Sequence, residues 1–394
     1  MSKTEFAALH SMEDLGHRWF EKWEHIQVFT HRNGYIPGAG LPENSLLALK
    51  ASKAAGHNHH EFDIVEVKDG HLVDHDMSPR RTINVAGRYN ELKLDDVVPK
   101  EILVREFRAE DFAPTSTHSG ENTMEIHEYL KQLKKIVPRG TFFPDCRDND
   151  FAKFAALISK HPDCASFVLM FYTFTINSGH DVAKAIDAAG AAPDWRQTVK
   201  LVLNLYPDQL VPMAKKASVI INSADDYFNF GVQFLQSFLD AGIHLAGILS
   251  QPTGVTLADL NDEEANDEGM RHEVFAEMAV PRLLAYIRAH PQLSKMKIGT
   301  GTRGYDISLP KANGGRNYYT YNLWTCNITL WPEGIRRLIK ERRATPGWCE
   351  AIVKPDFMCM DAPERAAYDC CGVPADASLG YGYPKYDGVE RSRA

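Results

Sequence analysis

The sequence has no apolar run of the roughly 20 residues that a helix needs to cross a bilayer, and residues 1–24 lack the uncharged apolar core of a signal peptide. Basic residues are also outnumbered by acidic ones. The 44 Lys and Arg residues and 52 Asp and Glu residues give a formal net charge of −8. No basic block interleaves with aromatic residues, as a nucleic-acid groove would require. We therefore expect a soluble cytoplasmic protein that neither spans a membrane nor binds nucleic acid.

The cysteines show no zinc-site spacing. The chain has seven of them, an odd number, and no paired C-x-x-C motif. They are mostly far apart, at Cys146, Cys164, Cys326, Cys349, Cys359, Cys370 and Cys371. Free thiols are the simplest interpretation.

Apolar strand-like segments alternate along the chain with segments that carry apolar residues at helical spacing. The strand candidates are residues 26–30, 61–67, 72–74, 141–145, 166–172, 199–205, 219–222, 245–250, 297–300 and 319–326. The helix candidates are residues 45–55, 123–136, 151–159, 181–189, 227–241 and 274–290. This alternation predicts an α/β fold, a TIM (β/α)8 barrel with a parallel sheet inside and helices outside. The strand candidates outnumber the eight strands of a barrel, so some of them are insertions or are not strands.

The predicted domain organisation has three parts. Residues 1–25 have the pattern of an amphipathic helix that closes the bottom of the barrel. Residues 26–345 form the barrel, with an insertion at about 88–122 that has no clear periodicity and is interpreted as a long functional loop. Residues 346–394 are rich in Pro, Gly and Tyr, and we expect a C-terminal extension that wraps the surface or packs on a neighbouring subunit of a homo-oligomer.

Carboxylates at the ends of two strand candidates predict a metal site. Glu61 and Asp63 alternate along one strand and therefore point to the same side of it. An isolated E-x-D pair more often merely ends a strand, but Asp145 ends a second apolar run and offers a third carboxylate, with Asp148 and Asp150 as close alternatives. Ligand sets made only of oxygen favour Mg²⁺ or Ca²⁺ over zinc.

Two histidines and two arginines supply the other groups of this predicted site. His31 and His75 each follow a short strand candidate, and with the carboxylates between them in sequence they suit a base and an acid on either side of a phosphodiester. Arg32 and Arg147 would pair with phosphate oxygens, because the guanidinium fork matches two of them. Asn44 either holds His31 or the metal shell by hydrogen bonds or caps the helix that follows, and both interpretations remain open.

Together these motifs resemble the glycerophosphodiester phosphodiesterase family, whose fold is the phospholipase-C-like phosphodiesterase barrel. The motifs are H-R-x-G from His31, P-E-N-S from Pro42, E-x-D from Glu61, K-D-G from Lys68, H-D from His75, Arg81-Thr82 and Gly87. The resemblance covers residues 26–90 well and continues more loosely through 123–130 and Asp145.

The resemblance implies a role for each group. The implied general acid and base are His31 and His75, and the implied metal ligands are Glu61, Asp63 and Asp145. The family's later acidic strand usually reads E-x-K, whereas residues 145–147 read D-C-R. Residues 324–327 resemble the family's W-T-x-N strand, which implies that Trp324 lines the pocket, although core packing explains a tryptophan on a strand equally well.

The expected function is metal-dependent cleavage of a glycerophosphodiester-like or sugar phosphodiester. The resemblance implies attack by a neighbouring hydroxyl and a cyclic phosphate that water later opens. Opening by a second alcohol would instead make a phosphodiester, as in a synthase or transferase resembling agrocinopine synthase, and residues 313–321 would suit a sugar acceptor. A catalytically idle barrel used for binding is the remaining alternative. The presence of all five central groups, the two histidines and the three carboxylates, argues against it. The expected partner is a small-molecule phosphodiester, with a sugar acceptor in the transfer reaction.

Overall fold

The described part of the chain forms two compact units. The structure, a computed structural model, describes residues 27–34, 43–54, 57–74, 108, 124–146, 151–172, 178–250, 257, 260–300 and 357–360. Residues 29–172 and 189–199 belong to one unit, which we call the N-terminal unit. Residues 173–188 and 200–376 belong to the other, which we call the C-terminal unit.

The N-terminal unit is built on a mainly parallel sheet. Its strands are β1 (Gln27–Thr30), β2 (His59–Val67), β3 (Gly70–Leu72), β4 (Thr141–Cys146) and β5 (Val168–Phe171). Strand β2 pairs in parallel with β1 and β4, and β4 pairs in parallel with β5, whereas β3 turns back antiparallel to β2. Nearly every residue of β2 is buried, which is typical of a strand covered on both faces.

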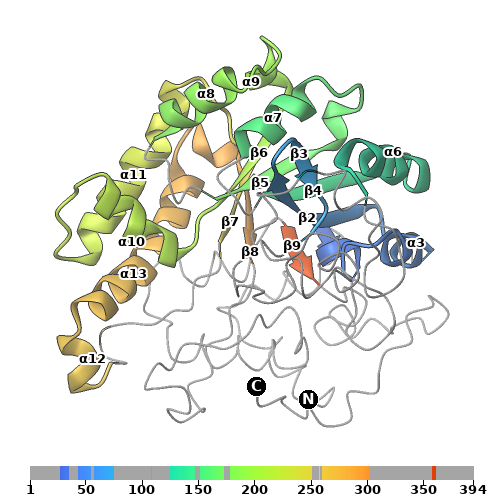
Figure 1. Cartoon of the computed structure of the whole chain (residues 1–394). Coiled ribbons are helices and arrows are strands. Elements are labelled where there is room, and N and C mark those ends of the chain that lie inside the picture. Colours follow the sequence, from blue (N-terminus) through green and yellow to red (C-terminus); the bar gives the residue numbers. More distant parts are fainter. Residues whose placement is uncertain are drawn as a thin grey trace, which may run out of the picture. The chain divides into compact units, whose positions relative to one another are not determined.

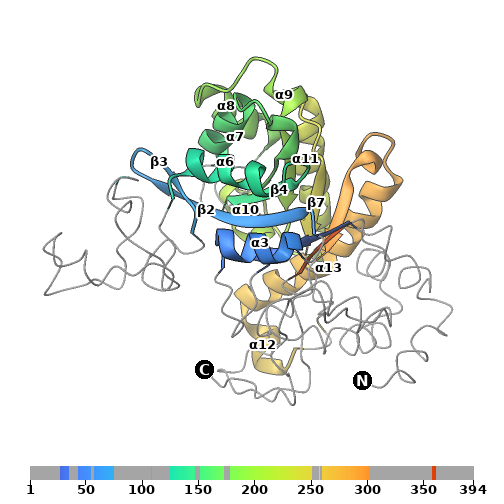
Figure 2. The ribbon, with the colours of Figure 1, turned by 90° about the vertical axis from the view of Figure 1, so that its right-hand side faces the viewer.

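Helices follow these strands in the chain. They are η3 (His31–Asn33), α3 (Leu46–Ala54), α6 (Ile126–Ile136), α7 (Phe151–Ser159), η6 (Cys164–Ser166) and α9 (Trp195–Thr198). The hydroxyl of Ser45 accepts a hydrogen bond from the backbone N–H of Ala48 at 2.9 Å and so caps α3. Helices α3 and α6 contact each other alongside β2 (Figure 2), and α7 contacts β5 and α9. Aromatic side chains fill the core, with the rings of Phe29 and Phe143 stacked at 4.3 Å.

The C-terminal unit repeats the alternation of strand and helix. Its strands, all paired in parallel, are β6 (Lys200–Asn204), β7 (Gly247–Ser250), β8 (Lys297–Thr300) and β9 (Phe357–Met360). Its helices are α8 (Gly179–Ala188), α10 (Pro207–Lys216), α11 (Ala224–Asp240), α12 (Asp262–Asn266), α13 (Glu268–Ala289) and η8 (Leu293–Lys295). Helix α11 contacts both α8 and α13, and α10 contacts α13 (Figure 1).

The predicted fold class is confirmed. In the described part of the chain, eight strands take part in parallel pairs and helices alternate with them in sequence, as in a (β/α)8 barrel. One predicted strand is wrong, because residues 219–222 form no strand and Ile220 is 81% exposed. The strand expected at 72–74 lies instead at Gly70–Leu72 and is antiparallel. The strand expected at 319–326 lies outside the described residues.

Several other predictions fall mostly on residues that the structure does not describe. These are the helix at 1–25, the insertion at 88–122 apart from Arg108, and the extension at 346–394 apart from β9. The predicted domain boundaries therefore stay predictions. Among the described residues, Cys146 and Cys164 take part in no disulfide. Among the described residues, no helix combines the length and apolar character of a membrane span.

Candidate active site

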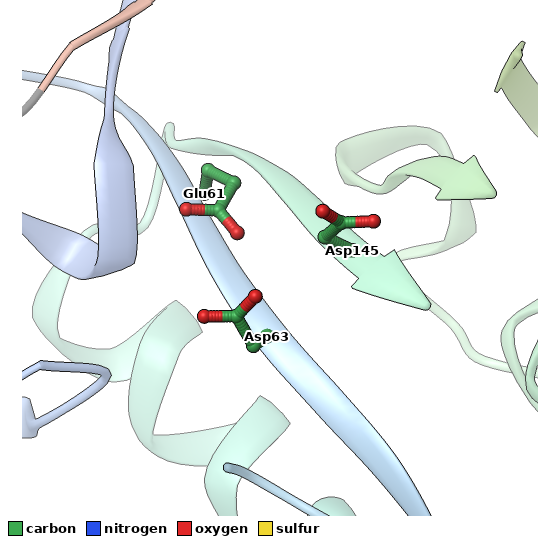
Figure 3. Close-up of side chains that lie close together, drawn as sticks. All are labelled: Glu61, Asp63 and Asp145. Carbon is green, nitrogen blue, oxygen red and sulfur yellow. The ribbon is translucent and has the colours of Figure 1, made fainter. Parts of the chain in front are cut away.

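Three predicted carboxylates lie together in the N-terminal unit (Figure 3). Glu61 and Asp63 are on β2, Asp145 is on β4, and Asp63 and Asp145 are partners in the parallel pairing of these strands. One oxygen from each carboxylate lies within 4.8 Å of the others. All three side chains are buried. Two strands thus bring together a cluster of hard oxygen ligands, which is the donor set that Mg²⁺ and Ca²⁺ prefer.

Electrostatics within this cluster favour a bound cation. Burial raises the pKa of Glu61 well above its usual range, and the carboxylates of Asp63 and Asp145 raise it further. The backbone N–H and the guanidinium of Arg32 oppose this shift. A divalent cation among the three carboxylates would offset their mutual repulsion.

The hydrogen bonding of the Glu61 carboxylate also suits a metal ligand. Glu61 Oε2 accepts a hydrogen bond from the backbone N–H of Arg32 at 2.6 Å. Glu61 Oε1 is buried and has no hydrogen-bond partner in the part of the chain that the structure describes. An unsatisfied buried carboxylate oxygen is costly, and a cation at this point would satisfy it. The residues present therefore fit a divalent metal ion.

Asn44 holds Asp63 by two hydrogen bonds. Its Nδ2 donates to Asp63 Oδ2 at 3.0 Å, and its Oδ1 accepts from the backbone N–H of Asp63 at 3.0 Å. The cap of α3 comes from Ser45. Of the two interpretations of Asn44, the geometry favours the one in which it supports the carboxylates.

Arg32 lies between two acidic residues. Its guanidinium forms an ion pair with Glu43, and its Nε lies 3.4 Å from Asp63 Oδ2. Both arginine and glutamate are buried, so this pair belongs to the framework of the site. The predicted contact of Arg32 with a substrate phosphate stays a prediction.

The backbone around these side chains has an unusual conformation. Arg32, Asn33 and Asn44 have φ values of 48°, 63° and 57°, in the left-handed region that residues other than glycine seldom adopt. The turn directs the N–H of Arg32 at Glu61, and the N–H of Asn44 donates to the carbonyl of Arg32 at 3.1 Å. Such conformations concentrate at functional sites, where the surrounding structure holds them.

Of the two predicted catalytic histidines, His31 lies within the described residues and His75 does not. His31 is buried, and its Nε2 lies 4.0 Å from Glu61 Oε2, so it borders the carboxylate cluster. His75, Arg147 and Trp324 lie outside the described residues, and their roles stay predictions.

Two tyrosines that the sequence analysis missed contact the site. Tyr172 Oη donates to Asp145 Oδ2 at 3.2 Å, and Tyr129 Oη donates to the carbonyl of Asn44 at 2.7 Å and accepts from the side chain of Asn33. Tyr172 directly follows β5, the neighbour of β4, so its position at a strand end was a usable signal. Tyr129 lies on the buried face of α6 and looks like an ordinary core residue.

Comparison with known families identifies this region. Residues 33–166 match the model of the glycerophosphoryl diester phosphodiesterase family. The chain is similar to that family over this segment. The resemblance drawn from the motifs is therefore confirmed, and the segment includes all three carboxylates and Asn44, while His31 and Arg32 directly precede it.

Solved structures similar to the chain include a glycerophosphodiester phosphodiesterase from Parabacteroides distasonis, with 14% identity and a TM-score of 0.44, over 87% of this chain and 95% of that chain. Another is an Oleispira antarctica phosphodiesterase in complex with the product sn-glycerol-3-phosphate, with 12% identity and a TM-score of 0.43, over 87% of this chain and 96% of that chain. No curated protein matches the sequence.

Proposed function

We propose that the chain is a metal-dependent phosphodiesterase that cleaves a small-molecule phosphodiester, of the glycerophosphodiester or sugar phosphodiester class. One observation carries this proposal: the buried cluster of Glu61, Asp63 and Asp145, with an unsatisfied oxygen and with His31 at its border. The family match of residues 33–166 supports phosphodiester hydrolysis as the reaction class.

Glu61, Asp63 and Asp145 would hold Mg²⁺ or Ca²⁺. When bound, the cation supplies positive charge that stabilises the negative charge developing on the phosphate oxygens. Asn44 fixes the carboxylate of Asp63, and Tyr172 donates a hydrogen bond to that of Asp145. These two side chains orient the ligands, a role that usually matters for metal affinity.

His31 is proposed to transfer a proton, in partnership with His75. An imidazole exchanges protons near neutral pH, so one ring can take the proton of the attacking hydroxyl while the other gives a proton to the leaving alkoxide. Where the substrate has a hydroxyl next to the phosphate, its attack releases the alcohol and forms a cyclic phosphate, which water then opens to a phosphomonoester. We propose Arg147 and Arg32 as groups that offset phosphate charge, and Trp324 as a wall of the pocket. A cytoplasmic location and a homo-oligomer also remain proposals.

Phosphorus NMR tests this function. The purified chain is incubated with Mg²⁺ or Ca²⁺ and with glycerol, choline-lipid and sugar phosphodiesters, with and without added sugar. His31→Ala is the inactive variant, and His127→Ala is its matched control, because His127 is exposed on α6. We expect a phosphomonoester or cyclic phosphate signal with the wild type and with His127→Ala, and none with His31→Ala.

Three results would contradict the proposal. A new diester signal that requires the sugar would make the protein a phosphodiester synthase. If the wild type gave no new phosphorus signal with any phosphodiester of the panel, a catalytically idle barrel used for binding would be favoured. Full activity of His31→Ala would remove His31 from the catalytic site.

A further inference from the structure

A second region of the N-terminal unit has the opposite charge from the carboxylate cluster. An open cavity of about 620 Å³ lies at the amino ends of β2 and β4 and is lined by Lys53, Asn58, His59, Pro138 and Arg139. We call it the basic cavity. The backbone N–H of Thr141 donates to the carbonyl of Asn58 at 2.9 Å, which ties the two sides of the cavity together. None of the lining residues belongs to the candidate active site.

The cavity is cationic in a chain that is acidic overall. Lys53 and Arg139 supply two positive charges, and none of the described lining residues is a carboxylate, although the formal net charge of the chain is −8. Lys53 Nζ donates to Asn58 Oδ1 at 2.8 Å, which places the ammonium at the cavity edge. Lys134 is not in the lining, but its Nζ donates to the carbonyl of the lining residue Pro138 at 2.8 Å, which places a further cation nearby.

Two of the three neutral residues in the lining, Asn58 and His59, have hydrogen-bonding side chains, and the third is Pro138. His59 contributes an imidazole to the lining. Asn58 is exposed and contributes an amide. Cations and neutral polar groups on one concave surface, with no acid among its described lining residues, suit a bound anion.

We propose that the basic cavity binds a small phosphate-bearing anion at a position separate from the carboxylate cluster. The guanidinium of Arg139 can donate two parallel hydrogen bonds to phosphate oxygens, and the ammonium of Lys53 offers a compact second charge. Two cations balance a phosphate dianion, and the volume leaves room for a short organic group on the phosphate. This proposal does not depend on the activity proposed for the carboxylate cluster.

Calorimetric titration of the full chain tests the proposal. Chelator is present throughout, so that no divalent cation draws phosphate to the carboxylates. The probes are inorganic phosphate and, separately, glycerol 3-phosphate. The test variant is Lys53→Gln with Arg139→Gln. The matched control is Lys50→Gln with Lys135→Gln, which removes the same charge at exposed positions of α3 and α6 outside the lining.

We expect saturable binding of at least one probe to the wild type and to the control, and a loss of about tenfold or more in affinity in the test variant, as expected for lost charge-assisted hydrogen bonds. Tighter binding of glycerol 3-phosphate than of inorganic phosphate would identify an organic phosphate as the ligand. The proposal is overturned if the wild type binds neither probe, if the test variant binds as well as the wild type, or if test variant and control lose affinity equally.

Discussion

At the scale of single residues, the site depends on side chains that hold other side chains. Asn44 donates to and accepts from Asp63, while Tyr129 fixes the backbone of Asn44. Tyr172 holds the carboxylate of Asp145 by a single hydrogen bond. Protein side chains thus fix the carboxylates, which lowers the free energy needed to assemble the site.

Replacing Asn44 should weaken both the fold and the metal site. Asn44→Gly removes the two hydrogen bonds to Asp63 but tolerates a φ of 57°, whereas Asn44→Ala keeps the Cβ and loses the short polar side chain with which asparagine tolerates the left-handed region. We expect Asn44→Gly to lower the free energy of unfolding by about 1–3 kcal/mol. Asn44→Ala should lower it by about 1 kcal/mol more. Chemical denaturation measures stability, and Mg²⁺ or Ca²⁺ titration measures affinity; cation affinity equal to the wild type in both variants would contradict the role of Asn44.

Tyr172→Phe should affect the metal more than the fold. The ring is kept, and only the donor to Asp145 Oδ2 is lost. We expect cation affinity to fall by about tenfold, the lower end of the usual effect of removing such a partner. Tyr286→Phe is the matched control, because Tyr286 is half-buried on α13 in the C-terminal unit. Equal affinities of the two variants for Mg²⁺ and Ca²⁺ would show that Tyr172 does not orient Asp145.

At the scale of helices and strands, two close contacts can be tested separately. Helix α8 approaches α11 so closely that a Cβ on Gly179 would lie 2.4 Å from the Cα of Phe238. The second residue of β2 is a buried histidine, His60, whose Nε2 donates to the carbonyl of His57 at 3.3 Å and whose Nδ1 lies 2.9 Å from Thr30 Oγ1. The first contact is steric and the second is polar, so they respond to different perturbations.

Gly179→Ala should destabilise the C-terminal unit. The new methyl group meets the backbone of α11, which cannot move aside as a flexible side chain would. Overpacking of this kind costs about 1–3 kcal/mol. Gly70→Ala is the control, because a Cβ there meets no atom within 4 Å. Urea denaturation compares the two variants, and equal stabilities would mean that α8 and α11 are less closely packed than the structure shows.

His60 should make the fold sensitive to acid. Burial, followed by the charge of His57, lowers the pKa of His60 to about 3, whereas an unfolded histidine has a pKa of about 6.5. Between these values the unfolded chain binds a proton that the folded chain does not, so this contribution to stability falls as the pH falls. Between about pH 6 and 5, we expect the free energy of unfolding to fall more steeply in the wild type than in His60→Gln. The expected difference is about 1.4 kcal/mol per pH unit. Urea denaturation at these two pH values checks this, and identical slopes would contradict a neutral buried His60.

At the scale of the whole molecule, patterns of apolar residues predicted most of the described elements and the carboxylate cluster. Glu61 and Asp63 share a face because side chains alternate along a strand, and parallel pairing brings Asp145 beside them. Helix α10 is absent from the predicted helices; it begins at Pro207, in the first turn, where proline is tolerated, and contains Pro212. Residues 219–222 have strand-like composition but are mainly exposed, so composition alone misled.

Features that depend on contacts between distant segments could not be predicted. The bond from Tyr172 to Asp145 joins two strands, and the ion pair of Arg32 with Glu43 depends on the left-handed turn between their segments. His60 belongs to a histidine-rich run that suggests a solvated loop, yet it lies inside β2. Sequence periodicity specifies which face a residue occupies, and it carries no information on which partner meets it there.

The most direct test of the central claim links cation binding to turnover. Chelator-treated wild type and Glu61→Gln are titrated with Mg²⁺ or Ca²⁺ while release of phosphomonoester from glycerophosphocholine is followed, and cation binding is measured in parallel by calorimetry. We predict that wild-type turnover is zero without the cation and saturates as the cation site fills, with the dissociation constant measured by calorimetry. We predict that Glu61→Gln stays folded, does not bind the cation at this site and does not turn over substrate. Full turnover of the wild type in excess chelator, or wild-type turnover by Glu61→Gln, would contradict the account.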